Sequence, residues 1–281
     1  MCEFCHKHGE GKTWYLQAKH YADDLLNDLG RRDHMRRFFS RPERLAKDQR
    51  DLEMLGRMPA FIQRAVSRYV SHRQKKIHYG QVVPIEDIER IFEFVTSITR
   101  IACICRHVTV GREQRYCYGL SLIPGGGQLV EAIREVDADY LTGPETRGLE
   151  EMGKDEALKA FRRHEAEGLC HTVWTFETPF IGGVCNCDQS DCLAMRTTFK
   201  SKVPVFFKAE FVARVDPDLC TGCRQCLKQC PFGAMDLSAA RKKVGVNERR
   251  CYGCGICRSV CAPKAINLLD RSAVPVASSL W

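Results

Sequence analysis

Two short cysteine-rich stretches near the carboxyl end decide how this chain folds there. They read Cys220-Thr221-Gly222-Cys223-Arg224-Gln225-Cys226-Leu227-Lys228-Gln229-Cys230-Pro231 and Cys251-Tyr252-Gly253-Cys254-Gly255-Ile256-Cys257-Arg258-Ser259-Val260-Cys261-Ala262-Pro263. Each follows the spacing Cys-x2-Cys-x2-Cys-x3-Cys, and the second lies 31 residues after the first. The repeat extends past the cysteines, because Ala234 aligns with Ala265 and Leu237 with Leu268. We interpret it as a duplicated unit folded about a pseudo-two-fold axis.

The cysteines point to metal chemistry rather than to disulfides. The chain has 17 of them, and its first eight residues contain no apolar stretch behind a basic start that would direct secretion. We therefore expect a cytoplasmic location, where thiols seldom pair with each other. Zinc also accepts four thiolates, but zinc ribbons usually carry paired Cys-x2-Cys motifs. Each run here instead has three closely spaced cysteines followed by a fourth. This pattern favours iron-sulfur clusters, and zinc is the alternative.

The duplicated stretch resembles the two-cluster ferredoxins of bacteria, in which the fourth cysteine of each run binds the cluster of the other run. The resemblance implies two 4Fe-4S clusters with crossed ligands. One set is Cys220, Cys223, Cys226 and Cys261, and the other is Cys251, Cys254, Cys257 and Cys230. One departure is visible, since Cys230 directly precedes a proline whereas Ala262 separates Cys261 from Pro263.

Six of the nine cysteines ahead of the duplication lie in two segments: Cys103, Cys105 and Cys117, then Cys185, Cys187 and Cys192. Six thiols exceed what packing needs, so we predict a third centre, a 4Fe-4S cluster or a metal ion, with Cys105, Cys117, Cys187 and Cys192 as its ligands. Buried thiols without a ligand are the alternative, because a free cysteine is often a small apolar residue. Arg106 and His107 either donate hydrogen bonds to this centre or serve as a surface arginine and a core histidine. Cys170 is assigned to the core.

A Cys-x-Cys-Arg segment and a Cys-Asn-Cys segment ahead of two ferredoxin motifs resemble uncharacterised 4Fe-4S binding proteins of anaerobic microbes. This likeness covers roughly residues 80–270.

The amino terminus carries a third, weaker pattern. Cys2-Glu3-Phe4-Cys5-His6 matches the motif for covalent c-type haem, but haem attachment belongs to translocated proteins. A metal or cluster site using Cys2 and Cys5, with His8 as a further ligand, and a terminus without a ligand are the two main alternatives.

The rest of the sequence predicts an α+β protein. Residues 1–79 form a helical region. The apolar residues between Trp14 and Leu29 recur at helical spacing, and we expect that helix to end at Gly30. Residues 80–211 form a mixed α/β domain with Cys-x-Cys loops, residues 212–270 the dicluster domain and residues 271–281 a tail. No window is long and apolar enough to span a membrane.

The net charge of the protein limits the kinds of molecule that we expect it to bind. The formal net charge is +8, and each 4Fe-4S core with its four thiolates contributes about −2, so two clusters leave about +4 and three leave about +2. Nucleic acid is therefore not an expected partner. The arginines between Arg31 and Arg44 form a solvated helix face or, alternatively, a docking site for an acidic partner.

The function that the sequence favours is one-electron transfer, as a carrier or as a relay subunit of an anaerobic redox complex, between a redox protein donor and an acceptor. No dinucleotide loop, phosphate-binding loop or nucleophile elbow is present, so we assign no catalytic residue and favour a component over a stand-alone enzyme. The alternatives are a reductase whose upstream cluster binds a substrate, and an iron-sulfur redox sensor that binds nucleic acid.

Overall fold

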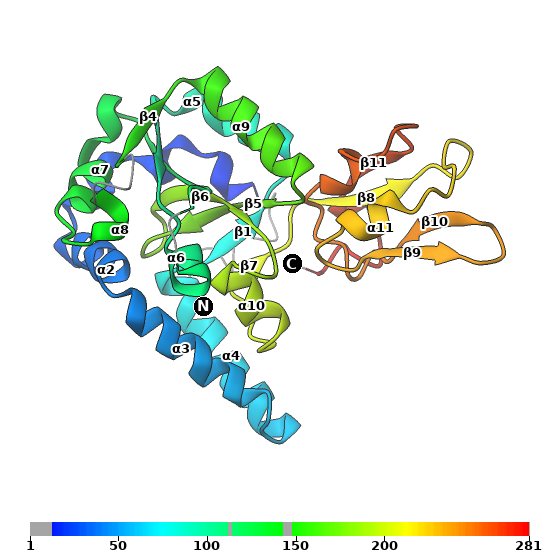
Figure 1. Ribbon diagram of the computed structural model, residues 1–281, viewed down its shortest axis with the longest axis horizontal. Coiled ribbons are helices and arrows are strands. Elements are labelled where there is room, and N and C mark those ends of the chain that lie inside the picture. Colours follow the sequence, from blue (N-terminus) through cyan, green and yellow to red (C-terminus); the bar gives the residue numbers. More distant parts are fainter. Residues whose placement is uncertain (1–12, 112–113, 143–147, 281) are drawn as a thin grey trace.

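The computed structural model describes residues 13–111, 114–142 and 148–280. Its centre is a seven-stranded sheet with the order β4-β2-β3-β6-β5-β1-β7, and Figure 1 shows this sheet surrounded by helices. The strands are β1 Gly80–Val82, β2 Ser97–Ile101, β3 Cys117–Ser121, β4 Glu150–Met152, β5 Cys170–Thr175, β6 Ile181–Cys187 and β7 Phe206–Phe207. Neighbouring strands are antiparallel except for β1 and β7. The fold class is α+β, as predicted.

The two faces of the sheet carry different side chains, because successive residues of a strand point to opposite sides. On one face Tyr118, Val184 and Val173 are paired across β3, β6 and β5, and they pack against α5 (Ile85–Phe94) and α9 (Lys154–Ala166) in one hydrophobic core. The other face carries Cys117 and Cys185, which are paired directly with each other. Helices cover this cysteine face: α2 (Leu29–Ser40), α6 (Ile104–Val110), α7 (Gly127–Arg134) and α10 (Leu193–Phe199).

The helical N-terminal region differs from the prediction at its start. Residues Trp14 to Asn27 form three 3-10 helices, Trp14–Leu16, Ala18–Tyr21 and Asp23–Asn27, instead of one α-helix. Gly30 lies inside the first turn of α2 rather than at a helix end, because the Asp28 side chain accepts hydrogen bonds from the backbone N–H groups of Gly30 (2.9 Å) and Arg31 (3.4 Å). An aspartate at this position caps a helix start. The predicted helix end is therefore wrong.

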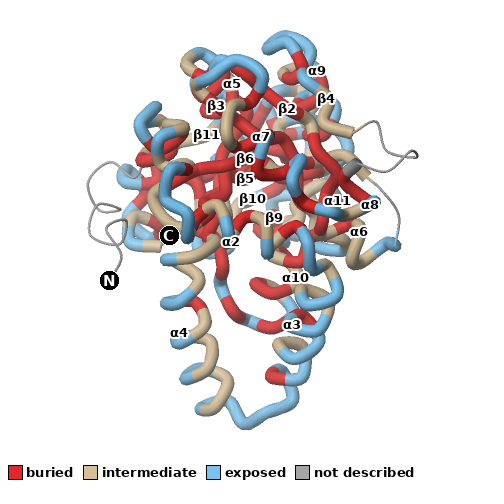
Figure 2. Tube along the Cα trace, turned by 90° about the vertical axis from the view of Figure 1, so that its left-hand side faces the viewer, coloured by how far each residue is buried: buried red, intermediate tan, exposed pale blue. Residues whose placement is uncertain are grey.

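Two further helices, α3 (Pro42–Leu55) and α4 (Ala60–Ile77), extend away from the sheet (Figure 1). Their far ends are exposed, whereas the strands are buried (Figure 2). The N-terminal region also shares its cores with the sheet, since Tyr15 and Tyr21 lie in one core and Met35 in the other. The boundaries that we drew at residues 79, 211 and 270 stay predictions. A further short helix, α8 (Asp139–Thr142), lies between α7 and β4 in the sequence.

The carboxyl-terminal part contains two small antiparallel sheets at one end of the molecule (Figure 1). In one, β8 (Phe211–Val215) pairs with β11 (Ile266–Asp270), and in the other β9 (Met235–Ser238) pairs with β10 (Lys243–Val246). The helix α11 (Gln225–Gln229) lies within the first cysteine run, and a 3-10 helix, Ile256–Arg258, lies within the second. The two cysteine runs thus occupy equivalent places in a duplicated unit.

The fully buried Arg271 links several segments of this region by hydrogen bonds. The Arg271 guanidinium donates hydrogen bonds to four backbone carbonyl oxygens, those of Ala209 (2.6 Å), Phe211 (2.8 Å), Cys251 (3.0 Å) and Leu280 (3.3 Å). It therefore joins the segment before β8, the second cysteine run and the end of the chain. Buried carbonyl groups that lose such a donor are costly.

Replacing Arg271 with alanine should destabilise the protein by about 3 kcal/mol or more, because several buried carbonyl groups would lose their donor. For a chain of this size we expect a Tm lower by roughly 6–12 °C in anaerobic thermal unfolding. Arg241→Ala, in an exposed turn, is the matched control and should leave the Tm nearly unchanged. Equal Tm values for the two variants would contradict the structural role of Arg271.

Candidate functional site

Two cavities in the carboxyl-terminal part are each bounded by four cysteines. The first is lined by Cys220, Cys223, Cys226 and Cys261. The second is lined by Cys230, Cys251, Cys254 and Cys257. Each cavity thus combines three cysteines of one run with the last cysteine of the other run.

Backbone conformation allows the cysteine loops to close around these cavities. Gly222 and Gly253 occupy equivalent positions in the two runs, with φ of +71° and +72°. A Cβ atom on Gly253 would collide with the carbonyl oxygen of Phe211, and one on Gly222 with that of Lys242. Both positions therefore require glycine, as residues with positive φ and a close backbone approach usually do.

Backbone N–H groups face the sulfur atoms. The Sγ atoms of Cys230 and Cys261 each accept a hydrogen bond of 3.3 Å, from Ala234 and Ala265 respectively. The Sγ atom of Cys251 accepts one of the same length from Ala213. Such donors stabilise a sulfur that carries negative charge, so they favour the thiolate and raise the potential of a cluster bound to it.

The surroundings of the cavities are largely apolar. Val215, Val244 and Ile266 line the first, and Phe232, Met235 and Tyr252 line the second. Burial raises the pKa of the Cys251 and Cys257 thiols, since an isolated thiolate is poorly solvated there. Iron ions would supply the positive charge that four thiolates need. Four converging sulfurs, backbone donors and an apolar wall therefore fit a 4Fe-4S cluster in each cavity.

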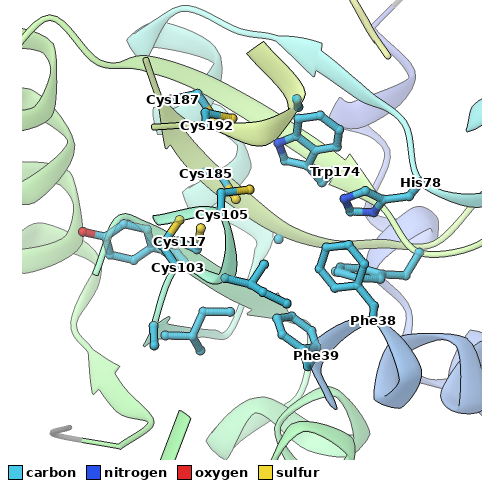
Figure 3. Close-up of a pocket in the computed structure, with 18 of the residues that line it drawn as sticks. Phe38, Phe39, His78, Cys103, Cys105, Cys117, Trp174, Cys185, Cys187 and Cys192 are labelled. Carbon is cyan, nitrogen blue, oxygen red and sulfur yellow. The ribbon is translucent and has the colours of Figure 1, made fainter. Parts of the chain in front are cut away.

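The six upstream cysteines lie together around a cavity of about 70 Å³ on the cysteine face of the central sheet (Figure 3). Cys117 and Cys185 come from β3 and β6, and Cys187 lies two residues further along the same face. Cys103 and Cys192 precede the first turns of α6 and α10 as their N-cap residues. The segments that are distant in sequence thus meet because sheet pairing and two helix starts converge.

The six side chains form one continuous string of sulfur contacts. Cys185 contacts Cys117, which contacts Cys103, and the string continues through Cys105, Cys192 and Cys187. The structure thus brings together all six cysteines of the predicted third centre, including the four proposed ligands. Within the described residues, no group of three or more His, Cys, Asp or Glu side chains is arranged to hold a metal ion.

Arg106 contacts this string of cysteines at Cys103. Its guanidinium is almost fully buried and donates to the carbonyl oxygen of Asn186 (3.1 Å) and, at 3.9 Å, to the Sγ atom of Cys103. It also pairs with Asp188 and stacks on the Tyr116 ring at 4.0 Å. Contacts with Cys105 and Cys117, together with the Arg106 charge, hold the pKa of Cys103 well below its usual range. Of the two alternatives for Arg106, the structure favours a donor to the cysteine centre.

Other residues occupy places that the sequence did not indicate. His107 stacks on Tyr140, with ring centroids 4.5 Å apart. On the far side from the sulfurs, the cavity is lined by aromatic rings from α2, from β5 and the residue after it, and from the segment before β1: Phe38, Phe39, His78, Trp174 and Phe176. No motif in the sequence marks these rings, because they come from three separate segments. Cys2, Cys5 and His8 lie outside the described residues.

The arginine stretch of the first region is partly engaged within the protein. Arg31 is buried and donates to the carbonyl oxygens of Leu25 and Glu177. Arg32 and Arg36 both form ion pairs with Glu135. The expectation of an ordinary solvated face is therefore wrong for Arg31, which is buried, whereas Arg32 and Arg36 stay partly exposed.

Comparison with known proteins places the carboxyl-terminal cysteine runs in an established family. Residues 213–262 match the model of the 4Fe-4S dicluster domain. One subunit of the ion-translocating oxidoreductase complex of Methanosarcina acetivorans is 37% identical over 49 residues, which are 17% of this chain and 18% of that relative. The chain thus covers less than a fifth of that relative's length. The predicted ferredoxin-type region is confirmed: this protein carries a 4Fe-4S dicluster domain near its carboxyl end.

Proposed function

We propose that this protein transfers electrons, one at a time, through two 4Fe-4S clusters in its carboxyl-terminal cavities. Cys220, Cys223, Cys226 and Cys261 would hold one cluster, and Cys251, Cys254, Cys257 and Cys230 the other. The observation that carries the proposal is that each cavity is bounded by three cysteines of one run and the last cysteine of the other.

We also propose that the six upstream cysteines hold a third centre, a 4Fe-4S cluster, with Cys105, Cys117, Cys187 and Cys192 as ligands. The arrangement of all six cysteines around one cavity and the contact of the buried Arg106 guanidinium with the Cys103 sulfur support it.

When bound, the clusters would accept and release single electrons without large structural change. The protein's own residues would set how this occurs. Backbone N–H groups of Ala213, Ala234 and Ala265 would stabilise the reduced state, while apolar walls keep water from most of the sulfurs. Cys223 is the exception, because it is exposed, and its side of the first cavity is where we expect a redox protein to dock.

The assembly context of the relative supports a relay role. That relative is named as a subunit of an ion-translocating oxidoreductase complex, so we propose that this chain too exchanges electrons within a larger oxidoreductase complex, in the cytoplasm. Among the described helices, none has the length and apolar character needed to cross a bilayer.

A reductase is the second candidate, and the aromatic half of the upstream cavity favours it. His78 is held there by a 2.6 Å hydrogen bond from its Nδ1 to the carbonyl oxygen of Thr175, and burial lowers its pKa to about 4. The ring is therefore neutral, with Nε2 as a hydrogen-bond acceptor. If only three of the upstream cysteines bound the cluster, this candidate would be favoured over a carrier.

Iron and acid-labile sulfide should both be present in anaerobically prepared protein. Two clusters correspond to about eight irons per chain and three clusters to about twelve. Elemental and sulfide analysis measures this directly. A colourless preparation that contains zinc and no sulfide would contradict the cluster assignment.

Crossed ligation makes a specific prediction for cysteine variants. Cys226→Ala and Cys261→Ala should weaken the same cluster, because their sulfurs line the same cavity, and Cys257→Ala and Cys230→Ala should weaken the other. Electron paramagnetic resonance of the reduced variants distinguishes the two clusters. Lys228→Ala, at an exposed position of the first run outside the lining of the cavity, is the control that should keep both signals. If Cys261→Ala behaved like Cys257→Ala, each run would instead close on itself.

The third centre is tested by Cys105→Ala and Cys187→Ala. Each should remove about four irons if the centre is a 4Fe-4S cluster, and both reduced dicluster signals should persist, because the six-cysteine cavity is separate from the other two. Metal analysis and electron paramagnetic resonance measure the two effects. Unchanged metal content in both variants would show that these thiols are only buried residues.

A further inference from the structure

The far end of the α3–α4 pair carries apolar side chains that the rest of the protein leaves uncovered. Met54, Met58 and Phe61 lie at the turn between the two helices, and their exposed fractions are 60%, 48% and 68%. We call these three residues the apolar tip. Figures 1 and 2 show the turn at the end of a projection that extends away from the central sheet. Large apolar side chains that gather on an exposed surface mark an interaction site.

The projection is fixed to the rest of the protein at its base. Leu55 is buried in one of the hydrophobic cores. On α4, the Ser71 hydroxyl donates to the carbonyl oxygen of Pro204 (2.7 Å), and on α3 the Glu53 carboxylate pairs with Arg196 at 2.7 Å. The inner side of the two helices is therefore already occupied by the protein itself.

The turn at the end of the projection is also held in place. The Gln63 side-chain amide donates to the carbonyl oxygens of Gly56 (3.0 Å) and Met58 (2.7 Å). One side chain of α4 thus satisfies two backbone groups of the turn. The apolar tip is therefore a defined convex surface, presented to the solvent by a braced turn.

Basic side chains lie directly behind the apolar tip. Helix α4 contains five lysine and arginine residues and no acidic residue. Arg64 and Arg68 are exposed and follow Phe61 at helical spacing, so they share its face of the helix. Arg57, in the turn, is exposed as well. The end of the projection therefore combines uncovered apolar side chains with positive charge.

We propose that the apolar tip inserts into the interface of a lipid bilayer that contains anionic lipids, with Arg57, Arg64 and Arg68 against the lipid phosphates. A helix rises by about 1.5 Å per residue, so Arg64 lies about 4.5 Å behind Phe61 along the axis. Apolar side chains that enter an interface reach about 5–10 Å into the boundary between headgroups and acyl chains. Arginines on the same face then remain at the level of the phosphates.

Other occupants would satisfy only part of this surface. A nucleic acid would neutralise the arginines but leave Met54 and Met58 without apolar contacts. A second copy of this chain would bring like charges together. A protein partner would need a cavity that matches a convex end. An anionic bilayer supplies both an adaptable apolar phase and phosphates, and it attracts basic residues over a Debye length.

Binding through the tip would leave the carboxyl-terminal part of the protein free. Figure 1 shows β8 to β11 at a different end of the molecule from the turn between α3 and α4. A redox partner could therefore reach the dicluster region while the projection holds the protein at the membrane surface.

The test is flotation of the full-length holoprotein with vesicles of phosphatidylcholine alone or with about 30% phosphatidylglycerol. We expect binding to the anionic vesicles only, and weaker binding at about 0.5 M salt. Phe61→Ser should weaken the binding about tenfold, because an apolar side chain no longer leaves water. Arg64→Gln should weaken it about fivefold, which is the effect of one basic residue near an anionic surface.

Insertion is measured separately with Phe61→Trp. Its indole emission should shift to shorter wavelength with the anionic vesicles, because the ring enters the interface. The unchanged protein serves as the blank for the three tryptophans of the chain. An emission that does not shift would contradict insertion of the tip.

Leu29→Ser is the matched control for Phe61→Ser, since Leu29 is 74% exposed on α2, outside the tip. Arg241→Gln, in an exposed turn, is the control for Arg64→Gln. Both controls should bind like the unchanged protein, and every variant should keep its iron. The proposal is overturned if the unchanged protein does not bind anionic vesicles, or if Phe61→Ser binds them as well as Leu29→Ser does.

A salt-sensitive gel shift of an oligonucleotide without any vesicle binding would also overturn the proposal, and would make nucleic acid the occupant. The result does not depend on the clusters. A protein that binds vesicles but contains no iron would contradict the proposed function alone.

Discussion

A buried thiolate is stable only where positive charge or hydrogen-bond donors face it, and the cysteine-lined parts of this structure follow from that requirement. In the carboxyl-terminal cavities the donors are the backbone N–H groups of Ala213, Ala234 and Ala265. In the upstream cavity the buried guanidinium of Arg106 donates to the Cys103 sulfur, while Asp188 pairs with the same guanidinium. The same need for compensation is the physical basis for expecting iron in these cavities.

Side chains alternate between the two faces of the central sheet, so one face packs the core and the other carries the cysteines. One face packs apolar residues against α5 and α9 and supplies stability. The other face presents Cys117, Cys185, Cys187 and Cys170, and helices that begin near Cys103 and Cys192 bring the remaining sulfurs over it. Cys170, at the start of β5, also shares one hydrophobic core with Cys254 of the dicluster domain.

Local sequence rules failed where tertiary contacts outweighed them. The spacing of the apolar residues from Trp14 to Leu29 suits an α-helix. Three short 3-10 helices form there instead, and they bury Trp14, Tyr15 and Tyr21 in a single core. Propensity is a weak preference, and burial of large aromatic rings against a sheet is worth more. Three arginines of α2 were likewise drawn into internal contacts, with Glu135 and with backbone carbonyls, which are distant in sequence.

The sequence by itself determined the dicluster domain, because the ligand spacing of each cysteine run is local and the duplication holds at all eight cysteines. It also indicated which six upstream cysteines belong together. Only the tertiary structure decided how they meet, what lines the other side of their cavity and that Cys170 and Cys254 share one hydrophobic core. Those relations depend on strand register and on the docking of α9 against both cysteine runs, and contacts between residues so far apart leave no periodic trace in a single sequence.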